Sequence, residues 1–454
     1  MDDRRPHRAD SLGTKPIGRL LWSTSTHTTM SVATYGIYAL TNAWFVSWGV
    51  GPDALVAVNI VSPVLLILGA VSTTVGVGGA SLVSRSLGSG NPHHAARAAG
   101  NTFLVYWSAA VIITLVGLLA LDPLLSLLGA RGDVRGLAHD YALIMLAGAI
   151  TFTGFSSLVR AEGSLRFSTM LWVLPVLCQI TLDPLFIFGL GWGVRGAALG
   201  TLAGQALSMA MSLWFFFVQR DRPYRITPAD LRPHGPTLRE LVAVGTPSFL
   251  TGLGATLVTL ITNNRLAASG DPAALAGYAT AVRVTTFVLM PQTGIAQGMQ
   301  PLIGFNVGRG LAERAERARI LALRATVLYG AVACVLLAGA ADTIAAAFAP
   351  DTRSTAAAVM RVMALSYPFA GVPALLSTYF QARGEPVPSF VISVGSILIV
   401  QVPVLLLLSA FGTRWLWTSF PMAALLSAAA AFLVLRRARS GELLRRRHEA
   451  VPGG

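Results

Sequence analysis

The sequence predicts an all-α polytopic membrane protein with twelve transmembrane helices in two pseudo-symmetric bundles of six. Three observations predict this fold. Of the 454 residues, 54% are hydrophobic and only 12% are charged, whereas a soluble protein carries about 25% charged residues. The apolar residues gather in twelve long runs, and short motifs of the first half recur in the second half.

The twelve apolar runs are each roughly 20 residues long, which is enough to cross the hydrocarbon core of a bilayer. Backbone groups in lipid need hydrogen-bond partners within the protein, so each run predicts a helix rather than a barrel strand. We expect the first run to be retained, because the polar opening MDDRRPHRAD does not lead into a cleavable signal peptide. The runs are centred near Tyr38, Leu68, Ile112, Ile150, Val176, Leu207, Val258, Met290, Val332, Ser366, Ile399 and Ala428.

The basic residues predict the orientation of the chain in the membrane. With the N-terminus inside, 26 of the 34 Lys and Arg residues fall in cytoplasmic segments, seven fall in outside loops, and Arg283 lies within a run. This bias predicts that both termini are cytoplasmic. The net charge of +14 then arises from the basic cytoplasmic segments of a membrane protein. We therefore expect the lipid bilayer, and not nucleic acid, as the partner of these basic residues. The segment RRRH at 445–448 is expected to meet anionic headgroups.

The internal repeat has an offset of 220 to 221 residues. An even number of spans in each half makes the halves parallel repeats, which is an architecture of secondary transporters that rock around a midplane cavity. The matching pairs are ALVAV (54–58) with ALAGY (274–278), LGSGNPHHAAR (87–97) with VGRGLAERAER (307–317), LVRAEG (158–163) with YFQARG (379–384), and Thr41-Asn42 with Thr262-Asn263.

The repeat and the longest polar stretch predict the division of the chain. The predicted parts are a cytoplasmic N-terminal tail (1–20), a first bundle (21–218), a cytoplasmic linker (219–240), a second bundle (241–435) and a basic cytoplasmic C-terminal tail (436–454).

Two stretches of the sequence indicate a particular protein family. The segments RAEGSLRFSTMLWVLPVLCQITLDPLFIFGLGWGVRGAALGT (160–201) and GIAQGMQPLIGFNVGRGLAERAERA (294–318) resemble signatures of the multidrug and toxic compound extrusion (MATE) family of the MOP flippase superfamily, in its bacterial multidrug-efflux branch. The resemblance implies a V-shaped, two-lobe antiporter in the bacterial cytoplasmic (inner) membrane. It also implies export of organic, often cationic, compounds against a proton or sodium gradient. We expect a monomer without a cofactor, with H⁺ as the coupling ion and Na⁺ as the alternative.

Asp183 is a carboxylate inside the apolar run QITLDPLFIFG (179–189). A charge at the bilayer centre costs about 2.5–3.5 kcal/mol on insertion scales, so such a residue normally faces the protein interior and marks function. Gln179, one turn earlier, is placed to hydrogen-bond it. The resemblance implies that this acid belongs to the cation- or proton-binding cluster of the N-lobe, with Thr201 at a neighbouring polar position. The alternative is that Asp183 only ties down a backbone group freed by Pro184.

The chain departs from the family pattern in the first span. The family usually carries an acid there, in a motif like DTxFVG, but TNAWFVSWG places Asn42 at that position. An amide can bind Na⁺ or form hydrogen bonds, but it does not take up a proton near neutral pH. The coupling-ion candidates for H⁺ or Na⁺ are therefore Asp183, Asn42, Gln179 and Thr201, and no other metal site is predicted. Asp183 is then the only deep carboxylate, which limits the site to one proton per cycle.

Other residues are candidates for substrate contact or for bending. The substrate-cavity candidates are Tyr38, Phe155, Arg283, Phe287 and Gln300, although for Arg283 a structural role is favoured, in which it holds the second bundle together through hydrogen bonds to carbonyl groups. The hinge candidates are Pro175, Pro184, Pro291 and Pro403, each of which interrupts helix hydrogen bonding; the alternative is that they only suit the packing. Glu162 and Arg160, at a cytoplasmic helix end, are expected to reach water.

The predicted function is a secondary active antiporter that exports drug-like compounds or secondary metabolites by alternating access, coupled to inward proton flow. Three alternatives remain: a Na⁺-coupled exporter, a flippase for lipid-linked precursors, and a degenerate transporter that binds without moving its ligand. A flippase would need a strongly cationic cavity, and Arg283 is the one intramembrane arginine. An enzyme is not expected, because all seven histidines lie in tails, loops or span ends.

Overall fold

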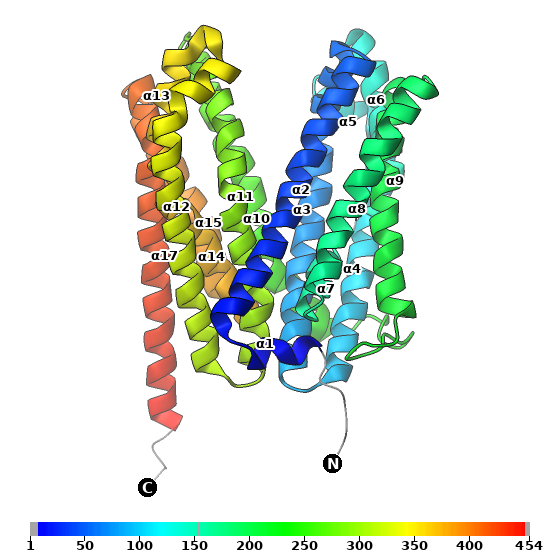
Figure 1. Cartoon of the computed structure of the whole chain (residues 1–454), viewed down its shortest axis with the longest axis vertical. Helices are drawn as coiled ribbons and strands as arrows, with labels where there is room; N and C mark the ends of the chain where they lie inside the picture. The colour runs from blue at the N-terminus through cyan, green and yellow to red at the C-terminus, as the bar shows by residue number, and fades with distance from the viewer. Residues whose placement is uncertain (1–7, 153, 450–454) are drawn as a thin grey trace. The chain divides into compact units, whose positions relative to one another are not determined.

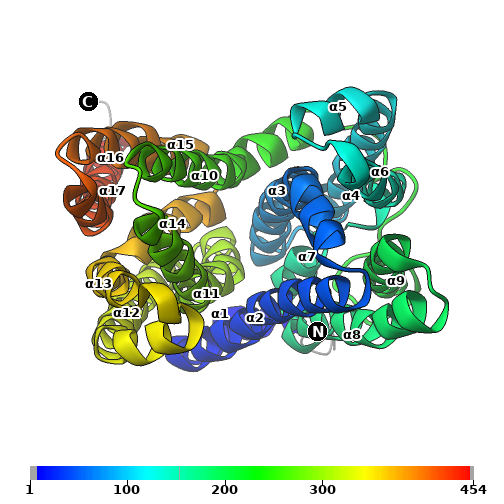
Figure 2. The same cartoon turned by 90° about the horizontal axis from the view of Figure 1, so that it is seen from above.

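The computed structural model describes residues 8–152 and 154–449, with side chains described for 9–152 and 154–440. Residues 1–7 and 450–454 of the two predicted tails lie outside the described residues, and so do the side chains of the RRRH segment at 445–448. Throughout the described ranges the regular structure is helical, and none of it is a strand. Figures 1 and 2 show the long helices from two perpendicular directions.

The first half of the chain contains the following helices: η1 (Arg8–Asp10), α1 (Ser11–Thr14), α2 (Ile17–Gly49), α3 (Pro52–Gly88), α4 (Pro92–Leu119), α5 (Leu121–Leu127), α6 (Gly132–Ala147), η2 (Ala149–Thr151), α7 (Ser156–Ala161), α8 (Leu165–Pro184), η3 (Leu185–Gly189), α9 (Gly193–Leu213) and η4 (Trp214–Val218). Of these, η3 and η4 are π-helical.

The second half contains α10 (Gly235–Ala268), α11 (Pro272–Gly308), α12 (Ala312–Phe348), η5 (Pro350–Thr352), α13 (Arg353–Ala364), α14 (Tyr367–Arg383), α15 (Pro386–Val394), the π-helical η6 (Gly395–Gln401), α16 (Val402–Ser409) and α17 (Thr413–Glu449). The C-terminal helix α17 therefore continues through the predicted basic tail as far as Glu449.

The helices account for the predicted spans. In the described part of the chain, nine helices are long and apolar enough to cross a membrane, or eleven if each of two bent pairs counts as one span. The remaining span is α2, which has 33 residues and is long enough to cross. Many Ser and Thr residues interrupt its apolar sequence. The chain is thus an all-α multi-pass membrane protein with twelve helical spans, as predicted.

The chain forms two compact units that exchange segments. Unit 1 holds the described residues up to Lys15, together with Met30–Gly245 and Gly304–Leu311, and unit 2 holds Pro16–Thr29, Thr246–Ile303 and the chain from Ala312 onward. Three long helices, α2, α10 and α11, therefore begin in one unit and end in the other. The simple lobe boundaries at 21–218 and 241–435 stay a prediction.

The first turns of α10 pack backbone to backbone against α3 within unit 1. A Cβ atom on Gly78 would lie 2.2 Å from the carbonyl oxygen of Leu241, and a Cβ atom on Gly245 would lie 2.2 Å from the carbonyl oxygen of Thr74. Only glycine permits this approach at either position. The α10 carboxylate of Glu240 also accepts a hydrogen bond from Arg85 of α3, at 2.7 Å. The start of α10 is therefore fixed to unit 1.

The linker before α10 is clamped to unit 1 by a buried ion pair. The guanidinium of Arg222 binds both carboxylate oxygens of Glu162 and also donates to the carbonyl oxygen of Phe216, at 2.7 Å. Tyr224 donates its hydroxyl to Glu162, at 2.5 Å. Burial raises the pKa of Tyr224 well above its usual value, so the phenol stays a donor. The expectation that Glu162 reaches water is wrong: its side chain is 2% exposed, because the linker supplies its partners.

A second clamp joins the linker to α4. Asn101, which is fully buried, donates its amide to the carbonyl oxygens of Asp230 (3.1 Å) and Arg232 (3.2 Å). Its carbonyl oxygen accepts from the backbone N–H of His234, at 2.9 Å. Because both clamps satisfy buried polar groups, the linker is a fixed part of unit 1 and not a loose tether.

We expect the Glu162→Gln variant to be much less stable than the parent protein. Removing one charge of a buried pair leaves the other uncompensated, at a cost of about 3–5 kcal/mol. The measurement is the thermal unfolding midpoint of the detergent-solubilised protein, with Arg220→Gln as the control, since Arg220 is an exposed linker arginine. Equal midpoints for the two variants would show that the ion pair does not clamp the linker.

Candidate functional site

The candidate site lies in unit 1, where α8 gives way to the π-helix η3. Asp183 is the penultimate residue of α8, followed by Pro184, and η3 begins at Leu185. Proline lacks the N–H that an α-helix needs, and a π-turn at such a place often accompanies a functional position. The side chain of Asp183 accepts a hydrogen bond from another side chain, and no backbone group of the described residues bonds to it. The alternative role would need a bond to a backbone group freed by Pro184, and the described residues contain no such bond.

Asp183 is fully buried and only partly hydrogen-bonded. Its Oδ2 atom accepts a hydrogen bond from Nε2 of Gln179, at 2.8 Å, as the spacing of one helical turn predicts. Among the described residues, no hydrogen-bond donor reaches Oδ1 of Asp183, and none reaches Oε1 of Gln179. Buried polar atoms are nearly always paired, so two unpaired oxygens in adjacent side chains mark this place as unusual.

The neighbouring helix α9 presents bare backbone to the carboxylate. A Cβ atom on Gly200 would lie 2.0 Å from Oδ1 of Asp183. One turn later, a Cβ atom on Gly204 would lie 2.7 Å from the carbonyl oxygen of Pro175 in α8. Helices α8 and α9 therefore pack very closely around Asp183.

A second polar pair joins α2 to α9 beside Asp183. Asn42 of α2, 5% exposed, donates its amide to the hydroxyl oxygen of Thr201, at 3.0 Å. The phenol groups of Tyr38 and Tyr141 also interact with Thr201, and both lie near Asp183. The structure thus brings all four predicted coupling residues into one buried cluster, and the half-buried Tyr38 lies beside it.

Sequence reasoning missed Tyr141 of α6. Its side chain is buried and reaches the same cluster. In the sequence it is one tyrosine in HDYALIM, and nothing in that segment distinguishes it from a packing aromatic.

The hydrogen bonds and possible ligands in the cluster help to decide which coupling ion it can bind. The amide N–H groups of Asn42 and Gln179 donate to Thr201 and Asp183, respectively. Over the described residues, no group of three or more His, Cys, Asp and Glu side chains is placed to hold a metal ion. The arrangement is a hydrogen-bonded acid with polar neighbours.

The remaining substrate-cavity candidates lie elsewhere. Arg283 and Phe287 have exposed side chains on α11 in unit 2, and Gln300 of the same helix is buried. The role predicted for Phe155 needs correction, because its ring is 1% exposed and packs 4.0 Å from the ring of Phe103 in the core of unit 1. A ring enclosed by other aromatic side chains has no surface left for a substrate.

The hinge candidates differ in their surroundings. Pro175 and Pro291 lie inside continuous α-helices, α8 and α11. Pro184 directly precedes the π-helix η3, and Pro403 follows the π-helix η6 at the start of α16. The role of these prolines in bending stays a prediction.

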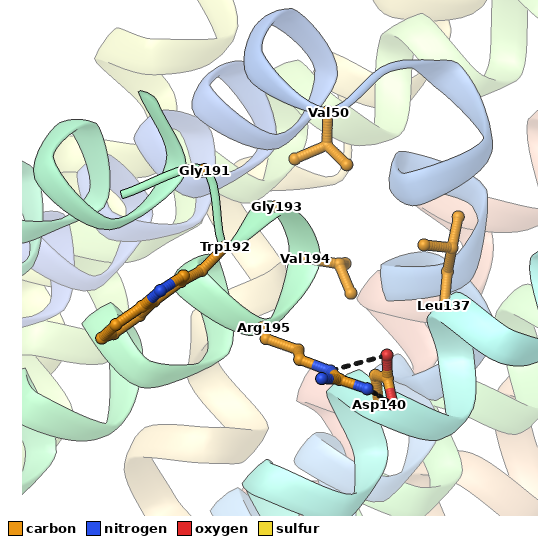
Figure 3. Close-up of a pocket in the computed structure, with 8 residues that line it drawn as sticks. All are labelled: Val50, Leu137, Asp140, Gly191, Trp192, Gly193, Val194 and Arg195. Atoms are coloured by element: carbon orange, nitrogen blue, oxygen red, sulfur yellow. Dashed lines mark hydrogen bonds and ion pairs between the residues drawn. The ribbon is translucent and has the colours of Figure 1, made fainter. Parts of the chain in front are cut away.

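A pocket of about 380 Å³ lies near the same helices (Figure 3). Its charged groups, Asp140 of α6 and Arg195 of α9, pair through two hydrogen bonds of 2.8 and 3.0 Å. Its other lining residues are Val50, Leu137, Gly191, Trp192, Gly193 and Val194. None of the predicted coupling residues lines this pocket, and its two charges satisfy each other.

The family model MatE matches residues 28–185 and 247–407, which is more than half of the chain. The chain belongs to the MATE family. It is therefore a membrane transporter and not an enzyme, as the sequence predicted. The MATE model spans α8 with Asp183, and it ends its first match at Leu185.

Relatives of this MATE protein cover nearly its whole length. It is 26% identical over 433 residues to the FAD transporter of Shewanella oneidensis, covering 93% of this chain and 95% of the relative. It is 28% identical over 415 residues to the multidrug export protein MepA of Staphylococcus aureus, covering 88% and 89%. A solved outward-facing structure of a multidrug resistance MATE transporter of the MOP superfamily shares 25% identity and a TM-score of 0.91, covering 96% and 99%.

Proposed function

We propose that this MATE transporter exports drug-like organic compounds, many of them cationic, across the cytoplasmic membrane of a bacterium in exchange for protons carried by Asp183. The observation that carries the proposal is the state of Asp183: it is fully buried, and among the described residues Gln179 supplies its one side-chain hydrogen bond. Export of drugs is supported by the multidrug export protein MepA, which this chain resembles over most of its length.

The surroundings of Asp183 suit a group that gains and loses a proton. An ionised carboxylate with one neutral donor and no counter-ion is costly to bury, whereas a neutral carboxyl group costs far less. Release of the proton therefore needs a change in the surroundings of Asp183. Alternating access supplies such a change when the transporter opens to the other side.

The amide at Asn42 fits a single-proton mechanism. Asn42 bonds Thr201 and keeps the same charge at every physiological pH, so it links α2 to α9 whether or not Asp183 is protonated. One deep acid in the described chain then moves one proton per cycle. We further propose that the transporter works as a monomer in the bilayer and that both of its termini lie in the cytoplasm. The distribution of its arginines supports this orientation.

A second substrate class is a flavin dinucleotide. The similarity to the FAD transporter of Shewanella oneidensis favours it, since the match covers 93% of this chain. Such a substrate is anionic, and Arg283 is an exposed cation on α11 that would suit it. Competition by FAD against a transported cationic dye distinguishes the two classes.

The test of the proposed function is transport in sealed proteoliposomes. A pH gradient imposed without sodium is expected to drive a fluorescent cationic dye against its concentration gradient, and vesicles without protein serve as the control. Dye movement that follows a sodium gradient and ignores the pH gradient would refute proton coupling and direct attention to Asn42, Gln179 and Thr201 as Na⁺ ligands.

A further inference from the structure

We propose that Gly200 of α9 is a positioning residue of the coupling site: its lack of a side chain leaves room for the Asp183 carboxylate, whose Oδ1 is turned to bare backbone and meets no donor among the described residues. The inference rests on the proposed function, in which Asp183 carries the transported proton.

The geometry shows that Asp183 occupies space that any other residue at position 200 would fill. A Cβ atom there would lie 2.0 Å from Oδ1 and 3.2 Å from Cγ of Asp183. A close carbon–oxygen contact is roughly 3.3 Å, so the carboxylate would have to turn away. Turning away would also disturb the hydrogen bond from Gln179 to Oδ2, which is the one bond that the carboxylate accepts from the part of the chain that the structure describes.

The chemistry around Oδ1 makes this position decisive for proton binding. The side chains near Asp183 are Gln179 on its own helix α8, Tyr38 on α2 and Tyr141 on α6, an amide and two phenols, and none of them is a cationic side chain. None of them donates to Oδ1. A glycine at position 200 adds no donor either, so the ionised form is left poorly stabilised. A hydroxyl group at this position would stabilise the ionised form by a charge-assisted hydrogen bond.

Close helix packing alone does not explain Gly200, because Gly204 provides a comparison on the same helix. A Cβ atom on Gly204 would press on the backbone oxygen of Pro175, at 2.7 Å, and would stay 3.7 Å from Cβ of Gln179. Gly204 therefore serves the contact between α8 and α9 without touching the carboxylate. The two glycines therefore allow a controlled comparison, because Gly200 lies against the Asp183 carboxylate and Gly204 lies against the backbone of α8.

The experiment titrates Asp183 directly in the purified, lipid-reconstituted full chain. Infrared difference spectra follow the C=O band of protonated carboxyl groups as the pH changes, and Asp183→Asn assigns the band. Gly200→Ala and Gly200→Ser share the added Cβ and differ only in the hydroxyl. We expect the Ser variant to titrate about one pH unit below the Ala variant. Gly204→Ala is expected to keep the parent midpoint, even where it lowers the thermal stability.

The outcomes separate this inference from the proposed function. A parent protein without an infrared band that Asp183→Asn removes would overturn proton coupling itself. A titrating Asp183 with the same midpoint in the Ala and Ser variants would overturn the role of Gly200 alone. If the Gly200 variants fold too poorly to titrate, a double-mutant cycle measures the same contact through thermal stability. Gly200→Ala should lower the unfolding midpoint less in an Asp183→Ala background, because the carboxylate is gone there. Equal losses in both backgrounds would contradict the geometry.

Discussion

Replacing Asp183 with asparagine is expected to abolish export driven by a pH gradient, lowering its rate at least about tenfold, to that of protein-free vesicles. Asparagine has nearly the same shape and can still accept the hydrogen bond from Gln179, so the cluster should stay folded. It cannot take up a proton, so the transport cycle loses its coupling step. The measurement is dye efflux from proteoliposomes under an imposed pH gradient at constant sodium.

Two controls make the Asp183→Asn result specific. Dye binding by the purified variant should stay within about threefold of the parent, because the lost step is proton exchange and not substrate contact. Asp140→Asn removes another acid of unit 1, one that pairs with Arg195 at the pocket in Figure 3. That variant should remain coupled. Persistent proton-driven efflux in Asp183→Asn would refute Asp183 as the proton carrier.

The sequence predicted the spans and part of the candidate cluster around Asp183 for clear physical reasons. Twelve apolar runs must be helices in lipid, and the i, i+4 spacing of Gln179 and Asp183 puts both side chains on one face of α8. The contact between Asn42 and Thr201 joins residues 159 positions apart, so periodicity does not reveal it. Resemblance to the MATE family suggested that contact. Neither helical spacing nor the family resemblance pointed to Tyr141. The packing of α6 against α9 brings its side chain to the cluster around Asp183.

The errors also have a physical cause. Glu162 finds its partner Arg222 sixty residues later in the linker, where local sequence cannot show the pairing. Phe155 was predicted to face a substrate, but it lies in an aromatic core. In membrane helices the lipid-facing and protein-facing sides are both apolar, so hydropathy does not tell which side of a helix is buried. Tertiary packing has to supply that information.

A second acid at Asn42 is expected to raise the number of protons exchanged per cycle from one toward two. In the Asn42→Asp variant, the new carboxylate would face the hydroxyl of Thr201, and the phenols of Tyr38 and Tyr141 already interact with that threonine. All three groups can donate hydrogen bonds to an ionised acid. Because Asp183 lies in the same cluster, the two carboxylates would titrate as a coupled pair, each opposing the ionisation of the other.

The stoichiometry is measured from the dye gradient at equilibrium, with the membrane potential clamped at zero by potassium and an ionophore. One exchanged proton supports about a tenfold gradient of dye per pH unit, and two protons support about a hundredfold gradient. The Asn42→Ser variant keeps a hydrogen-bonding group without a second acid, so it should retain the tenfold slope. If Asn42→Asp kept that slope as well, Asn42 would lie outside the proton path, and Asp183 would carry the coupling without any contribution from α2.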